Sequence, residues 1–382
     1  MPELLESSCN LERVAVIFNP ASGTETLETR RARVESLARA AGLPCELQET
    51  EELAGAAPLA EAALRDRMER VIVCGGDGSV MEAAGVVAGT DAALAVIPGG
   101  TGNLLAVNLG LPTDAEEAMR LALTGPVRRI DVGRANGHAF LIMAGMGADA
   151  RMIRDADREL KSRFGPLAYF IAAWKNRRRA RAEYRITIDG RSVRRHAQTV
   201  LVANLGRITG GVELVPGADP ADGLLEVAIL RARTPRELAL MALDALLGRP
   251  QRRDFLEVYR GREITIETEL PQPVQVDGNE VESTTRLEVR VEPGSLGLVG
   301  HPAGSEPAHG LLDPAEVARQ LPPVTLALLA GGAAAGAAHL AGRSRRRSRA
   351  VPLAAGLVVG IATYLVARAA VDAESRRSSG GR

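Results

Sequence analysis

The chain has 382 residues, which is enough for one large or two medium domains with hydrophobic cores of their own. Its 47 lysine and arginine residues equal its 47 aspartate and glutamate residues, so no overall positive charge favours nucleic acid as a partner. Cys9, Cys45 and Cys74 lack the spacing of metal ligands, and this cysteine usage is typical of a reducing cytoplasm.

Short apolar runs alternate with amphipathic stretches over residues 1–128. The runs predict strands at Val14–Phe18, Cys45–Gln48, Val71–Cys74 and Ala93–Ile97. The amphipathic stretches predict helices over Leu27–Ala41, Leu59–Met68 and Ser79–Ala88. Apolar strands separated by helices form a parallel sheet covered on both faces, and such sheets bind ligands at the carboxyl ends of their strands. We therefore expect an α/β domain in residues 1–128.

The pattern changes in residues 129–300, where short strands follow one another. Strands are predicted at Ile130–Gly133, Ala139–Met143, Tyr184–Asp189, Thr199–Asn204, Leu224–Leu230, Glu263–Glu267, Val274–Val276 and Leu287–Val291. Turn signals such as Asn136-Gly137 and Asp189-Gly190 separate several of them, which is typical of an antiparallel β-sandwich domain. Two helices are expected within it, at Pro166–Lys175 and Thr234–Leu247.

The C-terminal part favours membrane association. A linker over residues 301–322 precedes the segment 323–382, which holds the apolar stretches Val324–Ala341 and Leu353–Ala367 with an arginine-rich loop between them. If only Leu353–Ala367 spans and the other stretch lies in the interface, the arginines stay cytoplasmic, in agreement with the positive-inside rule. A spanning hairpin and buried soluble helices are the alternatives. Because no signal peptide opens the chain, the catalytic domains are expected on the cytoplasmic side.

Three glycine-rich loops, here named the glycine loops, follow three of the predicted strands: Asn19–Gly23, Gly75–Ser79 and Pro98–Asn103. Glycine lets the backbone approach a phosphate closely, and a helix N-terminus supplies unsatisfied N–H groups and positive partial charge. Asp77 is unsuited to bind phosphate directly but suited to Mg²⁺ or to orienting a hydroxyl group. No Walker-type sequence is present, and no dinucleotide fingerprint follows the first strand.

Together these motifs resemble the diacylglycerol kinase catalytic-domain family, which includes bacterial diacylglycerol kinases, YegS-like lipid kinases, and sphingosine and ceramide kinases. The resemblance continues through Gly145–Asp149, Pro216–Gly223 and Val276–Glu280, so that it covers roughly residues 12–300. It implies a nucleotide-binding α/β domain, a β-sandwich domain and an active site in the cleft between them. It also implies ATP and Mg²⁺ as cofactors and a hydroxyl of a membrane lipid as the phosphoryl acceptor.

The resemblance further implies roles for individual residues. The implied nucleotide contacts are Asn19, Pro20, Ala21, Ser22, Gly23, Thr50, Gly75, Gly76, Asp77, Gly78, Ser79, Val80, Met81, Glu82 and Thr101. The implied metal site consists of Asp219, Asp222 and the backbone of Leu224, with Pro220-Ala221 in place of a more polar stretch. The implied catalytic residues are Asp77 and a carboxylate among Asp277 and Glu280.

One departure from the family concerns the proton acceptor. The family places a general-base glutamate directly after Asp-Gly, whereas this chain has Asn279 there and Glu280 one position later. Consecutive side chains of a strand point to opposite faces, so Glu280 can substitute only if the chain turns. Our hypothesis is that a turn at Gly278-Asn279 brings Glu280 into the site, with Asp277 as the other candidate. The alternative is that Asp277–Glu280 is only a hairpin turn, because Asp-Gly is a strong turn signal.

Two rival functions fit parts of the pattern. An NAD kinase shares the Gly-Gly-Asp-Gly sequence, but Pro98–Asn103 has the lipid-kinase form. A nucleotide-binding, membrane-tethered protein that lost its base at Asn279 is the second rival. The identity of the lipid and the formation of a homodimer are left open.

Overall fold

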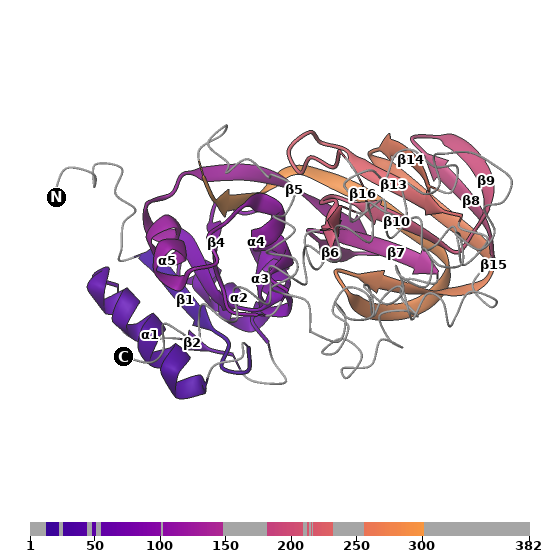
Figure 1. The fold of residues 1–382 in the computed structure, drawn as a ribbon. Helices are drawn as coiled ribbons and strands as arrows, with labels where there is room; N and C mark the ends of the chain where they lie inside the picture. The colour runs from indigo at the N-terminus through magenta and orange to yellow at the C-terminus, as the bar shows by residue number, and fades with distance from the viewer. Residues whose placement is uncertain are drawn as a thin grey trace, which may run out of the picture. The chain divides into compact units, whose positions relative to one another are not determined.

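The computed structural model describes residues 13–22, 26–43, 48–50, 55–100, 102–147, 182–208, 212–213, 215, 217–231 and 256–301. Its first part is a parallel sheet in the order β4-β3-β1-β2 (Figure 1). The strands are β1 (Val14–Phe18), β2 (Gln48–Glu49), β3 (Arg70–Gly75) and β4 (Ala93–Pro98), and each neighbouring pair is parallel. The predicted α/β architecture of this part is confirmed.

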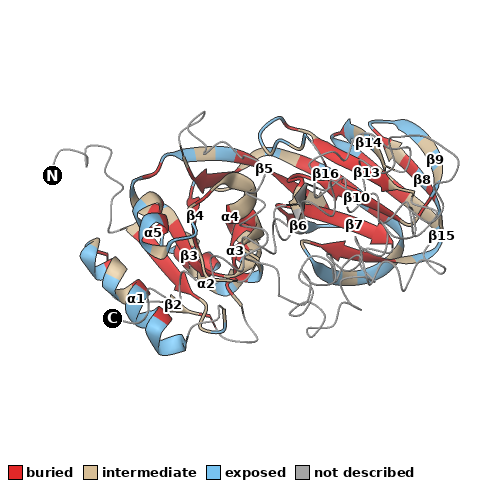
Figure 2. Ribbon diagram, viewed as in Figure 1, coloured by how far each residue is buried: buried red, intermediate tan, exposed pale blue. Residues whose placement is uncertain are grey.

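Among the residues that the structure describes, five helices cover the parallel sheet: α1 (Leu27–Ala40), α2 (Ala57–Arg65), α3 (Asp77–Val87), α4 (Leu104–Leu109) and α5 (Ala115–Thr124). Side-chain caps begin two of them, since Thr26 accepts a hydrogen bond from Thr29 N and Asp114 accepts two in the first turn of α5. One face of the sheet packs against α2 and α3, and the other packs against α1 and α5. The strands are therefore buried on both sides, as Figure 2 shows.

The second part is built from antiparallel strands around a separate hydrophobic core. The strands are β5 (Val127–Ala135), β6 (His138–Phe140), β7 (Met143–Gly147), β8 (Ala182–Ile188), β9 (Arg191–Ala197), β10 (Thr199–Ala203), β11 (Arg207–Ile208), β12 (Val212–Glu213), β13 (Leu225–Leu230), β14 (Leu256–Gly261), β15 (Glu263–Val276) and β16 (Asn279–Val299). β5–β6 and β8–β9 are joined by turns whose two central residues have positive φ, at Asn136-Gly137 and Asp189-Gly190. These predicted turns are confirmed, and their geometry is that of tight type I′ hairpins.

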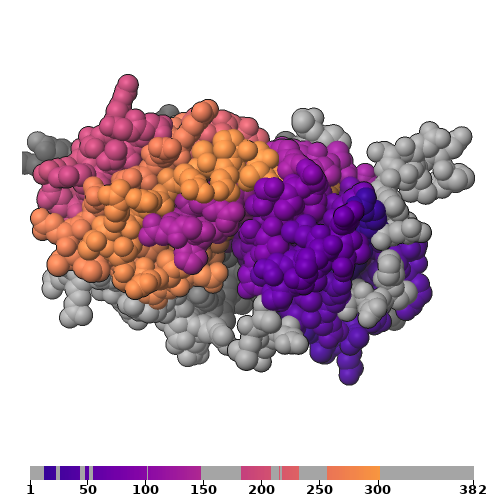
Figure 3. All heavy atoms as spheres, turned by 180° about the vertical axis from the view of Figure 1, so that it is seen from behind, coloured from indigo at the N-terminus to yellow at the C-terminus, as the bar shows by residue number. Residues whose placement is uncertain are grey.

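Two long strands join the two parts. β15 runs through both predicted strands Glu263–Glu267 and Val274–Val276, with register shifts between them. β16 extends far beyond the predicted Leu287–Val291, and its Gly297 and Leu298 pair in parallel with β4. β16 pairs with β5 over Val289–Val299, and Figure 3 shows the orange atoms of the last described residues against purple atoms from earlier in the chain. The last strand of the second part thus also belongs to the sheet of the first.

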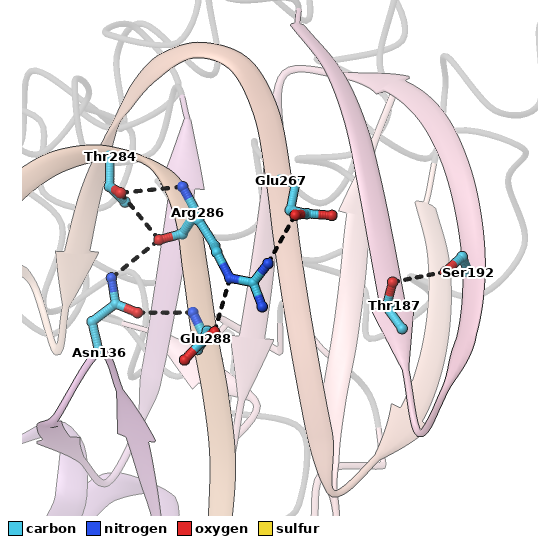
Figure 4. A network of polar contacts seen from close by, with 7 residues as sticks. All are labelled: Asn136, Thr187, Ser192, Glu267, Thr284, Arg286 and Glu288. Atoms are coloured by element: carbon cyan, nitrogen blue, oxygen red, sulfur yellow. Dashed lines mark hydrogen bonds and ion pairs between the residues drawn. The ribbon is translucent and has the colours of Figure 1, made fainter.

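The exposed face of the second part is polar and internally compensated (Figure 4). Arg286 on β16 pairs with Glu267 on β15 and with Glu288 on its own strand, while Thr187 and Ser192 hydrogen-bond across β8 and β9. Asn136 bonds Glu288 N and the Arg286 carbonyl, which fixes the β5–β6 turn against β16. Alternating charges of this kind are typical of a solvated sheet face.

Several predicted segments lie outside the described residues: the helices Pro166–Lys175 and Thr234–Leu247, and all of residues 302–382. The two apolar C-terminal stretches therefore stay predictions. Among the helices that the structure does describe, none is long and apolar enough to cross a membrane.

Candidate active site

The three glycine loops meet at the carboxyl ends of β1, β3 and β4, with backbone packed against backbone. A Cβ atom on Gly100 would lie 2.8 Å from the Gly76 Cα, and one on Gly75 would lie 3.3 Å from the Asn19 Cβ. Gly99 N donates to the Gly75 carbonyl at 2.8 Å. Glycine is required at Gly100 because any side chain there would separate the second loop from the third.

Two asparagines lock the loops. Asn19 Nδ2 donates to Ser79 Oγ at 2.6 Å, and Asn19 Oδ1 accepts from Ala21 N at 2.8 Å. Asn103, in the left-handed conformation at φ 45°, exchanges two hydrogen bonds of 2.9 Å with the backbone of Gly100. These hydrogen bonds hold Asn19 against the second loop and close the turn from Gly100 to Asn103.

Asp77 is the first residue of α3, and its carboxylate links the second loop to the third. Its Oδ1 accepts a hydrogen bond from Leu104 N at the start of α4. Burial raises the pKa of Asp77, and the backbone N–H groups around it act in the opposite direction. The α3 N-terminus has Gly76 as its cap residue and no side-chain cap. This terminus can therefore offer backbone N–H groups and positive partial charge to an anion.

The structure gives other partners to some predicted nucleotide contacts. Val80 is 2 % exposed in the core, so a contact from it could come only from its backbone. Met81 packs against the same core, and Glu82 Oε2 accepts from Ala56 N at 2.6 Å, at the start of α2. Thr50 is buried beside the end of β1. Gly23 and Thr101 lie outside the described residues.

Asp277 lies in the tight turn between β15 and β16. Its Oδ1 accepts from Ile142 N and Met143 N at 2.9 Å each, and its Oδ2 accepts from Leu141 N at 2.8 Å. Burial raises the pKa of Asp277 to about 6 against the effect of these three N–H groups, and the charge of Asp77 adds to the rise. Asp77 and Asp277 therefore lie close enough to repel each other.

The turn that we expected at Gly278-Asn279 is one residue earlier. Asp277 and Gly278 have φ values of 46° and 83°, and Val276 pairs with Asn279. Asn279 and Glu280 are therefore regular strand residues, because a type I′ turn needs only two residues with positive φ. The expected local kink after Gly278 is wrong.

The register nevertheless separates Asn279 from Glu280. Asn279 pairs with Val276, whose side chain packs in the core of the second part, whereas Glu280 pairs with Gln275. Gln275 in turn lies opposite Gly145, on the sheet face that carries Met143 and Leu201. These two residues belong to the hydrophobic cluster shared with the α/β part. Directly paired residues share a face, so Glu280, not Asn279, lies on the face toward that cluster.

Comparison with known proteins agrees with this architecture. The diacylglycerol kinase catalytic domain matches residues 13–135, and the YegS C-terminal NAD kinase beta sandwich-like domain matches residues 142–300. A diacylglycerol kinase of Bacillus subtilis is 32% identical over 243 residues, which are 62% of this chain and 80% of that protein. The chain belongs to the diacylglycerol kinase catalytic-domain family. This is a family of phosphotransferases.

Matches to other relatives cover different shares of those proteins. A Chromohalobacter salexigens protein named a probable lipid kinase YegS-like is 33% identical over 58% of this chain and 72% of that protein. An uncharacterized Synechocystis protein is 31% identical, but the match spans only 54% of it. A solved diacylglycerol kinase structure from Bacillus anthracis has a TM-score of 0.60 and 25% identity, and it covers 76% of this chain and 98% of that one.

The residues implied as a metal site make contacts within the protein, and the metal site stays a prediction. Asp219 Oδ1 accepts from Ala221 N at 3.0 Å, and Asp222 Oδ1 accepts from Leu224 N at 2.9 Å. Asp222 Oδ2 lies 3.7 Å from Arg260 Nη1, so Arg260 is a neighbouring positive charge. Over the residues the structure describes, no group of three or more His, Cys, Asp or Glu side chains could hold a metal.

Three residues that the sequence did not single out hold this loop instead. Arg260 bonds the Gly217 carbonyl and pairs with Glu226 Oε1 at 2.9 Å. Burial raises the pKa of Glu226 to about 7, although Arg260 opposes the rise. On the other side, Asp131 is 2 % exposed and accepts from Gly223 N and Gly294 N at 2.7 Å each. These contacts join positions far apart in the sequence, which local pattern does not indicate.

Proposed function

We propose that this chain transfers the γ-phosphoryl group of ATP to a hydroxyl of a membrane lipid, with diacylglycerol as the first acceptor to test. The observation that carries the proposal is the convergence of the three glycine loops with Asp77 at their centre. The membership of the chain in a phosphotransferase family and the names of its relatives support it.

The backbone does most of the binding in this proposal. The N–H groups at the start of α3 hold the phosphates, because they carry positive partial charge and have no side-chain cap. Gly78, in the first turn of α3, leaves the backbone open, because a Cβ atom there would meet nothing within 4 Å. Catalysis of phosphoryl transfer rests largely on such positioning and charge stabilisation.

Asp77 fits a magnesium ion bound together with nucleotide. Its Oδ1 is engaged by Leu104 N, and its Oδ2 faces Gly102, where a Cβ atom would lie 2.8 Å away. A single carboxylate together with phosphate oxygens is a common environment for Mg²⁺. When bound, the ion would neutralise charge that develops on the phosphates.

Glu280 is the proposed acceptor of the lipid hydroxyl proton. It is an exposed carboxylate on the sheet face shared with Gln275 and Gly145, whereas Asn279 has no basic group and lies on the other face. Asp277 is a weaker candidate because three backbone N–H groups already use its carboxylate. We assign Asp277 to holding the 141–143 backbone beside the site.

The C-terminal segment 323–382 is proposed to keep the enzyme at the cytoplasmic side of a membrane. A lipid acceptor does not leave the bilayer, so tethering raises its effective concentration. A shortened protein that ends near Gln320 should phosphorylate detergent-dispersed lipid but lose activity on vesicles.

The test uses the purified full-length protein with radiolabelled ATP, Mg²⁺ and dioleoylglycerol in mixed micelles. Phosphatidic acid is the expected product, and the Asp77→Asn variant should form none. Sphingosine, ceramide and NAD are offered in parallel as acceptors. Labelling of NAD alone would replace the proposal with an NAD kinase, and nucleotide binding without labelling of any acceptor would favour a protein that has lost catalysis.

A further inference from the structure

Arg30 is a buried arginine beneath the first glycine loop. It lies in the first turn of α1 and is only 9 % exposed. Its Nη2 donates to Ser22 Oγ at 2.7 Å and to the Asn19 carbonyl at 3.3 Å, and its Nη1 donates to the Pro20 carbonyl at 3.4 Å. One guanidinium therefore bonds three residues of the loop that follows β1.

The same guanidinium also touches the third glycine loop. A Cβ atom on Gly99 would lie 3.1 Å from Arg30 Nη2, so the third loop passes directly against it. The same Cβ atom would lie 3.5 Å from the Gly75 Cα, where the second loop begins. Arg30 thus lies beneath the first loop and against the third, at the point where the third passes the second.

A fixed orientation accompanies this position. The Arg30 Cζ lies 5.2 Å from the centroid of the Phe18 ring, within the range of a cation–π contact. Phe18 is fully buried at the end of β1, so the aromatic ring forms a rigid base for the guanidinium. A buried charge costs free energy unless it is compensated, which indicates that this arginine does more than fill space.

The chemistry of the proposed ligand requires a cation here. A nucleoside triphosphate brings several negative charges to a site that already contains Asp77. Phosphate-binding loops commonly add a lysine, but the two lysines of this sequence, Lys161 and Lys175, lie outside the described residues. Arginine is the residue that keeps its charge even when buried.

We propose that Arg30 is a positioning residue of the nucleotide site. It holds the first glycine loop in its binding conformation and places a permanent positive charge behind the phosphate groups. This inference rests on the proposed function, since it concerns the ATP site of that reaction, but it does not depend on which acceptor is phosphorylated.

Nucleotide binding tests the inference without any lipid. The dissociation constant of trinitrophenyl-ATP is measured by fluorescence at several salt concentrations for the full-length wild type, Arg30→Met, Arg30→Lys and Arg31→Met. Arg31 is the matched control, because it lies next along α1, is half exposed and pairs with Glu35 and Glu49. Thermal unfolding is recorded for each variant.

Arg30→Met should weaken binding at least about tenfold, the factor that corresponds to about 1.4 kcal/mol, and should flatten its salt dependence. Arg30→Lys should keep the salt dependence and bind with intermediate affinity, because it retains the charge without the fork. Arg31→Met should stay within about twofold of wild type, as expected for a surface ion pair. If Arg30→Met does not fold, the dissociation constants of Arg30→Lys and Arg31→Met are compared instead.

Equal affinities for Arg30→Met and Arg31→Met would overturn the inference. So would equal weakening in Arg30→Met and Arg30→Lys with an unchanged salt slope, since that pattern indicates packing alone. A wild type that binds no nucleotide would overturn both this inference and the proposed function. A wild type that binds nucleotide through Arg30 but phosphorylates no lipid would overturn the proposed function only.

Discussion

Two loops of similar composition differ in how their polar groups are satisfied. The second glycine loop, Gly75–Ser79, leads into a helix whose N-terminus has no side-chain cap. The loop from Gly217 to Leu224, which the family resemblance marked as a metal site, is bound on one side by Asp131 and on the other by Arg260. The second glycine loop therefore keeps backbone N–H groups that a ligand can bind. In the loop from Gly217 to Leu224, polar groups are bound by the protein itself.

This difference concerns the groups that hold each loop. The Arg260 guanidinium connects the Gly217 carbonyl with Asp222 and Glu226, so protein groups fix the loop from Gly217 to Leu224. Arg30 lies beneath the first glycine loop, and the backbone N–H groups at the start of α3 have no side-chain cap. A motif in the sequence therefore indicates a loop conformation more securely than it indicates what the loop binds.

The largest effect is expected from a substitution in the second glycine loop. Asp77→Asn keeps an oxygen to accept from Leu104 N but removes the charge. Lipid phosphorylation should fall by at least about two orders of magnitude, because the carboxylate that would face Mg²⁺ is lost. The unfolding temperature should stay near that of wild type. Near-normal turnover in the mixed-micelle assay would mean that the phosphate-loop assignment is wrong.

A smaller loss of activity is expected at the proton acceptor. Glu280→Gln should lower the turnover number about a hundredfold, the usual range for a positioned base. Glu282→Gln is the matched control, because Glu282 is also exposed and lies two residues along the same strand. A sharp gain of activity in Asn279→Glu would instead identify a naturally weakened enzyme. Loss in Asp277→Asn with a harmless Glu280→Gln would transfer the role to Asp277.

The next prediction concerns the loop from Gly217 to Leu224 and is measured as the free energy of unfolding. Arg260→Ala leaves the buried Glu226 without its ion pair, which should lower the unfolding free energy, by less than the roughly 3 kcal/mol of a fully buried pair because Arg260 is half exposed and Glu226 can take up a proton. EDTA should not change the stability of the wild type measured by urea unfolding. Arg262→Ala, on the neighbouring exposed position, serves as the control. If EDTA destabilises the wild type as strongly as the Arg260 substitution does, a bound metal ion stabilises this loop and the prediction is wrong.

The parallel sheet and the glycine loops could be predicted from the sequence because their signals are local. β1 has the predicted limits Val14–Phe18, and the other three described strands of this sheet overlap their predictions. Each loop follows a strand, and parallel topology brings the loop ends to one edge. The hairpin turn at Asp277-Gly278, one of the two alternatives for this segment, is confirmed, and the kink at Gly278-Asn279 is wrong, because either dipeptide suits a turn.

The rest depends on contacts between distant residues. β9 and β14 were missed because Arg195 and Glu257, which interrupt their apolar pattern, compensate each other only after the strands are folded. The inward-facing roles of Asp131, Arg260 and Arg30 likewise arise from partners far away in the sequence or hidden by a local helix pattern. A single arginine on an amphipathic helix is more often solvent-exposed, so no sequence signal distinguished Arg30 from Arg31.

The smallest expected effect is a pH dependence at Asp277, which lies between the two parts. Its pKa in the folded protein is raised to about 6, mainly by burial, so the protonated form is favoured on folding. The stability that this provides is fully present below the ordinary carboxyl pKa and is lost as the pH rises through about 6. The lost amount should be on the order of 2 kcal/mol, and it should disappear in Asp277→Asn, which cannot ionise. Urea unfolding of both proteins between about pH 4 and 7, without nucleotide or divalent ions, measures it as a difference. A difference that grows with pH instead would mean that the three N–H groups of residues 141–143 outweigh burial, and that Asp277 is ionised wherever the enzyme works.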